Sequence, residues 1–191
     1  MVLIAGPNGA GKTTLYETRV APVFFGPFVN ADLIQRDELG DPSPHAAYRA
    51  ARIAETRRNE CLARGKSFAT ETVFSHPSKL ELVRQAKVQG FAVVLLHVGV
   101  ATADLSVARV GSRIGEGGHA VPEQKIRDRY VRQGPLIREA MLLSDQGHVY
   151  DNSGLNAPPE RIIGFVAGRV TFAQPEVPVW ALAIYRRDLA R

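Results

Sequence analysis

The stretch G-P-N-G-A-G-K-T-T near the amino terminus limits the folds open to this chain more than any other feature. It fits the pattern G-x-x-x-x-G-K-[ST], in which backbone N–H groups surround phosphate groups and a helix begins at the lysine. The apolar run before it predicts a strand over residues 2–5, and residues 12–18 predict a helix. We therefore expect a nucleotide phosphate site made by Gly6, Pro7, Asn8, Gly9, Ala10, Gly11, Lys12, Thr13 and Thr14.

Two residues carry the charge chemistry of such a loop. The ammonium group of Lys12 is expected to neutralise the β- and γ-phosphate oxygens, and the hydroxyl group of Thr13 to ligate Mg²⁺. The positive end of the first helix dipole adds to the attraction for phosphate. The alternative interpretation is a chance glycine-rich turn, which the complete pattern and its flanks disfavour.

Composition bounds the class of protein. The 191 residues suit one domain, and 45% apolar and 23% charged residues are ordinary for a soluble globular chain. The net charge of +5 favours anionic partners without choosing among them. Nucleic acid is disfavoured as a partner, because the arginines are scattered through predicted helices instead of clustering with aromatic residues.

Cysteine usage and hydropathy indicate a compartment. Cys61 is the only cysteine, which excludes an intramolecular disulfide and a cysteine-based zinc site, and we expect a buried, inert thiol. The first residues lack the positively charged region of a signal peptide, and the longest apolar run, residues 91–98, is too short to span a bilayer. The sequence thus predicts a cytoplasmic protein without a membrane partner.

Strand and helix patterns alternate along most of the chain. Strands are predicted at residues 2–5, 28–30, 67–71, 91–98 and 148–151, and helices at 12–18, 45–64, 78–89, 101–113, 122–130 and 135–143. The run at 91–98 is apolar on both faces and is expected to be the central strand. The prediction is an α/β fold of three layers, with a five-stranded, mainly parallel sheet between helices.

The last residues predict an extension of that core. Residues 161–166 and 169–172 are expected to form a hairpin, and residues 177–189 a helix. We therefore expect a P-loop core over residues 1–155 and a hairpin and helix extension of the same domain over residues 156–191. The glycine-rich segment that ends near Pro122 suits a mobile lid around residues 109–122, and its alternative interpretation is a plain surface loop.

Two carboxylates are predicted at strand ends. Asp32 follows the second strand and Glu71 ends the third, so both should lie at the sheet edge where the phosphate loop lies. Asp32 could instead cap the turn that follows it, and the two roles are compatible. The alternative for Glu71 is a salt bridge at the strand edge.

These carboxylates select a reaction class. The chain has no apolar strand ending in Asp-Glu, no L-S-G-G-Q segment and no N-K-x-D motif, which argues against transporter ATPases and GTPases. An Asp located 20 residues after Lys12 is typical of small-molecule kinases, in which it accepts the proton of the acceptor hydroxyl. Arg109 and Arg113, one helical turn apart, are expected to stabilise the transferred phosphoryl group, with a solvated role as the alternative for Arg113.

The order of these motifs resembles the zeta-toxin-like P-loop kinase family. The resemblance covers residues 2–153 and rests on G-P-N-G-A-G-K-T-T, V-N-A-D, A-T-E-T and the glycine-rich segment G-G-H-A-V-P. It implies phosphorylation of the sugar 3′-hydroxyl of UDP-N-acetylglucosamine by ATP and Mg²⁺, and an antitoxin protein that occludes the nucleotide site. Zeta toxins have longer helical elaborations than this compact chain, so another acceptor, and a housekeeping kinase, remain open.

The resemblance also assigns residues one position at a time. It makes Asp32 the general base and Arg109 the first lid arginine, while Arg113, His119 and Arg127 compete for the second. Glu55 falls where the family has a helix carboxylate facing the sugar nucleotide, although a solvated glutamate is the alternative. Asn152 would lie on the adenine side or cap a turn. The expected acceptor-binding residues are Asn30, Glu55, Thr70, Glu71 and Thr72.

A second function stays open beside the kinase. The chain could be a nucleotide-binding regulatory or nucleic-acid-associated protein that hydrolyses little ATP. Acceptor-stimulated turnover separates the two, because only the kinase requires it. The two strand-end carboxylates favour the kinase.

Overall fold

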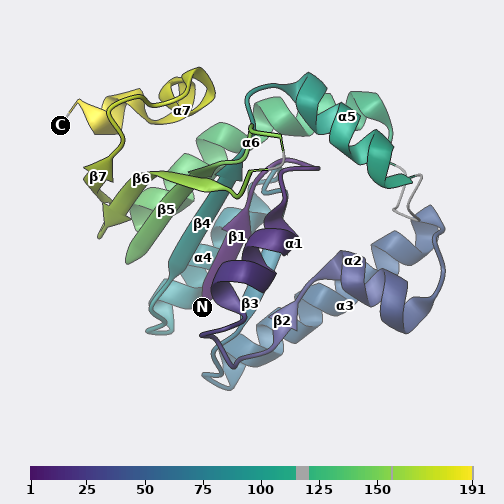
Figure 1. Ribbon diagram of the computed structural model, residues 1–191. Helices are drawn as coiled ribbons and strands as arrows, with labels where there is room; N and C mark the ends of the chain where they lie inside the picture. Colours follow the sequence, from purple (N-terminus) through teal and green to yellow (C-terminus); the bar gives the residue numbers. More distant parts are fainter. Residues whose placement is uncertain (115–120, 156, 191) are drawn as a thin grey trace.

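The computed structural model describes residues 1–114, 121–155 and 157–190, apart from the side chains of residues 113 and 114. The strands form one sheet in the order β2-β3-β1-β4-β5-β6-β7 (Figure 1). The first five are parallel, and β6 and β7 are antiparallel. Their bounds are β1 (Val2–Ala5), β2 (Phe28–Val29), β3 (Ala69–Thr72), β4 (Val94–Gly99), β5 (Gln146–Asp151), β6 (Glu160–Val166) and β7 (Arg169–Ala173).

The helices follow the strands as the alternating pattern predicts. They are α1 (Lys12–Leu15), α2 (Ala31–Leu33), α3 (Pro44–Ala63), α4 (Ser78–Val88), α5 (Ala103–Ile114), α6 (Glu123–Leu143) and α7 (Val179–Leu189). The π-helical segments η1 (Tyr16–Val20) and η2 (Ile34–Leu39) continue α1 and α2. The predicted α/β fold with a mainly parallel sheet is confirmed, and β4 is its middle strand.

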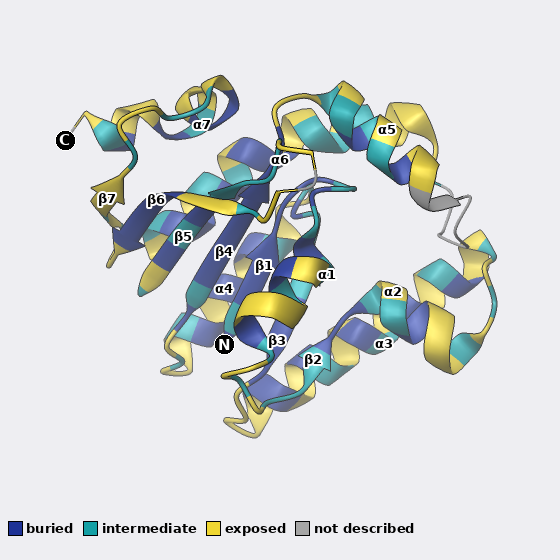
Figure 2. Cartoon of the chain, viewed as in Figure 1, coloured by how far each residue is buried: buried dark blue, intermediate teal, exposed yellow. Residues whose placement is uncertain are grey.

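Side chains alternate between two apolar clusters, one on each face of the sheet. In β1, Leu3 and Ala5 join the larger cluster with α3, α4, α6 and α7, whereas Ile4 joins the smaller one with α1. Figure 1 shows α1 in front of the sheet and α3 and α4 behind it. Both β1 and β4 are buried along nearly their whole length (Figure 2), as expected of strands covered on two sides.

Two expectations about the later elements need correction. The hairpin of β6 and β7 is present but does not stand apart from the sheet, because β6 pairs with the free edge of β5 and brings the sheet to seven strands. The two helices predicted at 122–130 and 135–143 are one helix, α6, with Pro135 inside it. Buried residues on both sides of the proline, Ile126 before it and Ile137 and Met141 after it, anchor the helix and outweigh the lost hydrogen bond.

The carboxyl ends of the parallel strands meet at one edge, and this edge gathers the predicted site. β1 pairs with β3 in a register that sets Ile4 opposite Glu71, and β3 pairs with β2 so that Thr70 lies opposite Val29. The phosphate loop therefore leaves β1 beside the ends of both strands that carry the predicted carboxylates.

Candidate active site

The loop between β1 and α1 has the backbone conformation that the motif predicts. Gly6, Gly9 and Gly11 have φ angles of 154°, 71° and 81°, a region that side chains rarely adopt. A Cβ atom on Gly6 would collide with the carbonyl oxygen of Val98. The glycines thus let the loop turn tightly against the end of β4.

Lys12 and Thr13 begin α1 and lie against neighbouring elements. Lys12 is only 9% exposed, and its ammonium group donates a hydrogen bond to the carbonyl oxygen of Pro7, 3.0 Å away. The hydroxyl group of Thr13 donates to Oε2 of Glu71 at 2.9 Å. Glu71, expected at the acceptor position, is therefore held on the residue that should ligate Mg²⁺.

Residues 30 and 32 divide two roles that the sequence left open. Oδ1 of Asn30 accepts hydrogen bonds from the backbone N–H groups of Asp32, at 2.7 Å, and Leu33, at 3.3 Å. Asn30, not Asp32, is therefore the cap of α2, which corrects the alternative role suggested for Asp32. The Asp32 side chain is exposed at the sheet edge, as a general base must be to meet an acceptor.

Three of the predicted acceptor-binding residues serve the fold. Asn30 is 3% exposed and its side-chain oxygen holds the cap. Thr70 is 1% exposed and donates to the Val29 carbonyl oxygen at 2.7 Å, which joins β3 to β2. Thr72 accepts from the backbone N–H of Phe74 at 3.2 Å. These contacts lie within the protein, and a role of the three residues in acceptor binding stays a prediction.

Arg129 on α6 is a site residue that the sequence reasoning missed. Its Nη1 lies 3.5 Å from Oδ1 of Asn8 in the phosphate loop. Burial lowers the pKa of Arg129, and the negative charge of Asp32 opposes that shift, which places the two side chains in one electrostatic environment. A guanidinium group thus lies beside the phosphate loop, close enough to Asp32 to feel its charge.

Of the candidates that the sequence offered for the second lid arginine, only Arg127 has a described side chain, and it is engaged elsewhere. Arg127 forms ion pairs with Asp104, at 2.6 Å, and Glu123, at 2.7 Å. The side chain of Arg113, the lid residues 115–120 and His119 lie outside the described residues. The signal for Arg129 was its helical spacing: Ile126, three residues before it, and Gln133, four after it, are both buried, so it lies on the inner side of α6.

Arg109 joins three segments at the other side of the loop. Its guanidinium group donates to the carbonyl oxygens of Asn152, at 2.6 Å, and Gly154, at 3.0 Å. The side chain of Asn152 donates in turn to the carbonyl oxygen of Ala10 at 2.9 Å. Arg109 therefore holds the loop after β5 against the phosphate loop.

A cavity of about 440 Å³ opens beside α1, next to this contact. Its volume lies within the range of small-molecule sites, and its wall is mostly apolar with a few polar groups, which suits a purine ring. Both Asn152 and the helix that follows the phosphate loop contribute to it. The lining residues are Thr14, Thr18, Arg19, Asn152, Ala157, Pro158 and Pro159.

Comparisons with known proteins bear on the fold of the chain. No protein-family model matches the chain. An uncharacterized protein of Haemophilus influenzae is 27% identical over 130 residues, which are 68% of this chain and 91% of that protein. The structure of AvrRxo1-ORF1:AvrRxo1-ORF2 with ATP superposes with a TM-score of 0.69 at 13% identity, over 98% of this chain and 62% of that one.

Two further solved structures cover most of the chain. The PezAT chromosomal toxin-antitoxin system of Streptococcus pneumoniae gives a TM-score of 0.60 at 16% identity, over 98% of this chain and 76% of that one. Shikimate kinase from Acinetobacter baumannii gives a TM-score of 0.52 at 22% identity, over 82% of this chain and 84% of that one. The chain therefore shares the α/β fold of these solved structures. It spans about three fifths of the length of the AvrRxo1 chain that it matches.

Few groups beside the phosphate loop could hold a metal. Among the described residues, no group of three or more His, Cys, Asp or Glu side chains could hold an ion unaided. Thr13 and Glu71 supply oxygen atoms beside the phosphate loop, and Mg²⁺ is usually held by one or two such ligands together with phosphate oxygens. The donor set therefore fits a metal that arrives with the nucleotide.

Two residues singled out in the sequence, Glu55 and Cys61, lie on α3. Glu55 is exposed and lines a smaller cavity between α3 and α4, while Cys61 is a free, buried cysteine on α3. Among the residues that the structure describes, no helix is long and apolar enough to cross a membrane.

Proposed function

We propose that this chain is an ATP- and Mg²⁺-dependent kinase that phosphorylates a hydroxyl group of a small substrate, with a nucleotide sugar such as UDP-N-acetylglucosamine as the first candidate. The observation that carries the proposal is the grouping of Lys12, Thr13, Glu71 and Asp32 at one sheet edge, with Arg129 facing it. The ATP named with the AvrRxo1 structure supports the choice of nucleotide.

Each group has a role in phosphoryl transfer. The phosphate loop would hold the triphosphate, with the purine ring in the cavity beside Asn152. Mg²⁺ bound at Thr13, with Glu71 orienting that hydroxyl, would neutralise phosphate charge. Asp32 would accept the proton of the acceptor hydroxyl while the hydroxyl oxygen bonds to the γ-phosphorus. The bond between the γ-phosphorus and the oxygen that bridges it to the β-phosphate would break, which releases ADP. Lys12 and Arg129 would stabilise the charge on the transferred group.

The test is ADP release from Mg-ATP, measured with and without a panel of nucleotide sugars. An acceptor should stimulate release by the wild type, and Asp32→Asn should lower the stimulated rate roughly 10²- to 10⁴-fold, the usual contribution of a general base. Asp37→Asn is the matched control, because Asp37 is exposed on η2 and forms an ion pair with Arg36. Equal rates in Asp32→Asn and the wild type would remove Asp32 from the mechanism.

A rate of ADP release that no acceptor raises would favour the alternative function, a nucleotide-binding regulator. Salt-sensitive binding of RNA or DNA would then support that reading. A protein partner belongs to the kinase proposal, since the PezAT system is a toxin-antitoxin pair. Such a partner should suppress ADP release by covering the nucleotide cavity, and ATP should weaken its binding.

A further inference from the structure

A second cavity lies between α3 and α4, on the side of the sheet away from α1. Its volume is about 170 Å³, several times the roughly 30 Å³ that one water molecule occupies in the liquid, so a tetrahedral anion fits. The residues that line it are Glu55, Arg58, Asn59, Ser78, Lys79, Glu81, Leu82 and Gln85. The phosphate loop contributes none of them.

Arg58 is the unusual residue of this cavity. It is 8% exposed, yet its guanidinium group forms no hydrogen bond or ion pair with the described residues. Its neighbour Arg57, which is more exposed, forms a two-point ion pair with Glu38 at 2.5 and 2.6 Å. An arginine keeps its charge in proteins, and because the Arg58 nitrogens are not among the described buried atoms that lack a partner, they face the opening of the cavity. Of the two neighbouring arginines, Arg58, the more buried one, therefore lacks a carboxylate partner.

Lys79 brings a second positive charge into the same cavity. Burial lowers its pKa, and the charge of Arg58 lowers it further, so the two cations lie near each other. The backbone N–H of Lys79 donates to the carbonyl oxygen of His76, but its ammonium group shares no hydrogen bond or ion pair with the part of the chain that is described. It lies in the first turn of α4, where the helix dipole also favours an anion.

The carboxylates of the cavity do not neutralise these cations. The charge of Glu55 acts on Arg58 and Lys79 from a distance, since among the described residues Glu55 forms an ion pair within 4.0 Å with neither of them. Glu81 is engaged with Arg84 at 3.9 Å and accepts a hydrogen bond from Gln85 at 3.4 Å. Two converging cations without a bonded carboxylate form a site for an anion that comes from outside.

We propose that Arg58 and Lys79 form a second anion-binding site, which takes a phosphate or phosphate-ester group. This inference does not rest on the proposed kinase function. The source of the group is either free phosphate or the phosphate ester of a small molecule. The size of the cavity and the pairing of a forked guanidinium with a point-charge ammonium suit both.

Inorganic phosphate is the probe, and calorimetric titration is the measurement. The phosphate loop would also bind this ion, so the titration uses the Lys12→Met variant, in which that loop has lost its cation. We expect one saturable phosphate site in Lys12→Met, weakened at least tenfold by adding Arg58→Met or Lys79→Met. Adding Glu55→Gln should strengthen binding, because the nearest competing carboxylate loses its charge.

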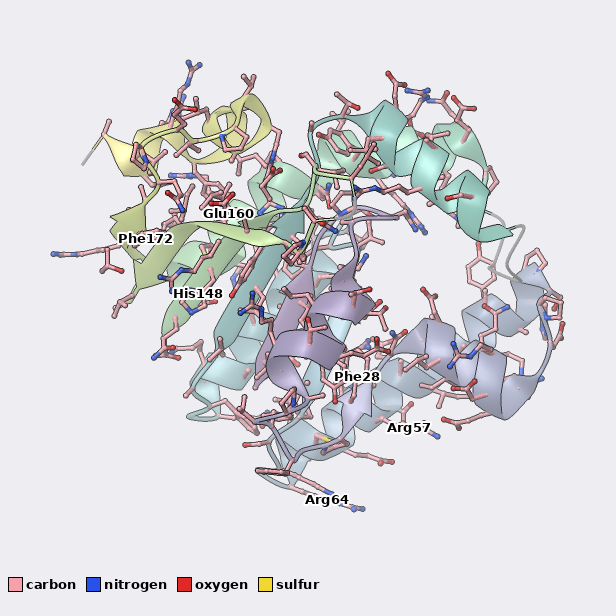
Figure 3. All side chains as sticks on the ribbon, viewed as in Figure 1. Phe28, Arg57, Arg64, His148, Glu160 and Phe172 are labelled. Atoms are coloured by element: carbon pink, nitrogen blue, oxygen red, sulfur yellow. The ribbon has the colours of Figure 1, made fainter. Side chains whose placement is uncertain are left out.

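Arg64→Met is the matched control, since Arg64 is exposed at the end of α3, pointing away from the ribbon (Figure 3). It should leave phosphate binding unchanged. The proposal fails if Lys12→Met binds no phosphate saturably, or if Arg64→Met weakens binding as much as Arg58→Met does. Glycerol 3-phosphate separates the sources: binding equal to that of phosphate indicates a phosphate-ester ligand, and exclusion indicates free phosphate. Neither result depends on turnover, so failure of the kinase proposal would be seen separately.

Discussion

At the scale of single residues, Arg129 tests the electrostatic part of the proposed site. Arg129→Met removes a guanidinium group that faces Asn8 and Asp32, and we expect the acceptor-stimulated rate to fall roughly 10²- to 10³-fold, as when one donor to transition-state charge is lost. Arg127→Met is the control, because its ion pairs with Asp104 and Glu123 keep that side chain on the outer surface of α6. A similar loss in both variants would mean that only helix packing was changed.

The buried His97 gives a prediction about pH. It lies under α7 with Nδ1 2.8 Å from the Tyr185 hydroxyl oxygen, and burial lowers its pKa to about 3 from an ordinary 6.5. Between these pH values the unfolded chain holds a proton on this ring that the folded chain does not. The free energy of unfolding should therefore fall as pH falls, by up to about 1.4 kcal/mol per pH unit from this group.

Urea unfolding of the wild type and His97→Gln between pH 7 and pH 4 measures this effect. The variant is expected to start less stable but to lose less stability on acidification. His45→Gln is the control, because His45 is exposed at the start of α3. If His97→Gln and the wild type show the same slope, another group carries the acid sensitivity.

The sequence located the loop residues and Asp32 more surely than it located their partners. Residues 6–14 form the predicted loop and helix start because the pattern is local, and its glycines take the positive φ angles that the turn requires. The Thr13–Glu71 hydrogen bond joins residues 58 apart, and only the β1–β3 register brings them together. Asn30 caps α2 because its side-chain oxygen accepts from two backbone N–H groups, whereas the sequence suggested only Asp32 for this role.

At the scale of elements, α6 shows where local rules are overridden. A proline inside a helix removes a hydrogen bond, which is why the sequence predicts a break before Pro135. Packing of Ile126 and Ile137 on the two sides keeps the helix whole, and Gly134 lies close to Ile184 of α7. The continuous helix links the site residue Arg129 rigidly to the core.

Replacing the proline measures this conflict. Pro135 is exposed, so Pro135→Ala creates no cavity and restores a backbone N–H. We expect the free energy of unfolding in urea to rise by about 1 to 3 kcal/mol, since proline is about 3 kcal/mol worse than alanine inside a helix. Val131→Ala, on the exposed side of the same helix, is the control for helix propensity. A loss of stability in Pro135→Ala would show that the α6 geometry depends on the proline.

At the scale of the whole molecule, the last helix is connected by a chain of contacts to the cavity beside α1 that we propose for the nucleotide. Trp180 of α7 packs over Gly99, and its Nε1 donates to Oδ1 of Asp151 at 2.8 Å. The same oxygen accepts from the hydroxyl group of Ser153 at 2.6 Å, which fixes the turn next to Asn152. The sequence predicts the helix but not this contact, because residues 151 and 180 meet only after the hairpin has joined the sheet.

Trp180→Phe keeps the apolar contact and removes the hydrogen bond. We expect the KM for ATP to rise roughly 3- to 10-fold with little change in kcat, as for the loss of one hydrogen bond that positions a binding loop. Leu182→Ala is the control, because this partly exposed side chain lies on the same helix without a contact to Asp151. A fall in kcat with an unchanged KM would contradict the positioning role of Trp180.

The hydrogen bond from Lys12 to Pro7 has a consequence for how a nucleotide would associate. A surface lysine gives up about 2 kcal/mol of rotamer entropy when it is ordered, but Lys12 is already ordered and buried in the resting protein. Its ammonium group is already held inside the loop when a phosphate arrives. Binding of a triphosphate should therefore cost little side-chain entropy at Lys12 and should leave the backbone of the loop nearly where it is.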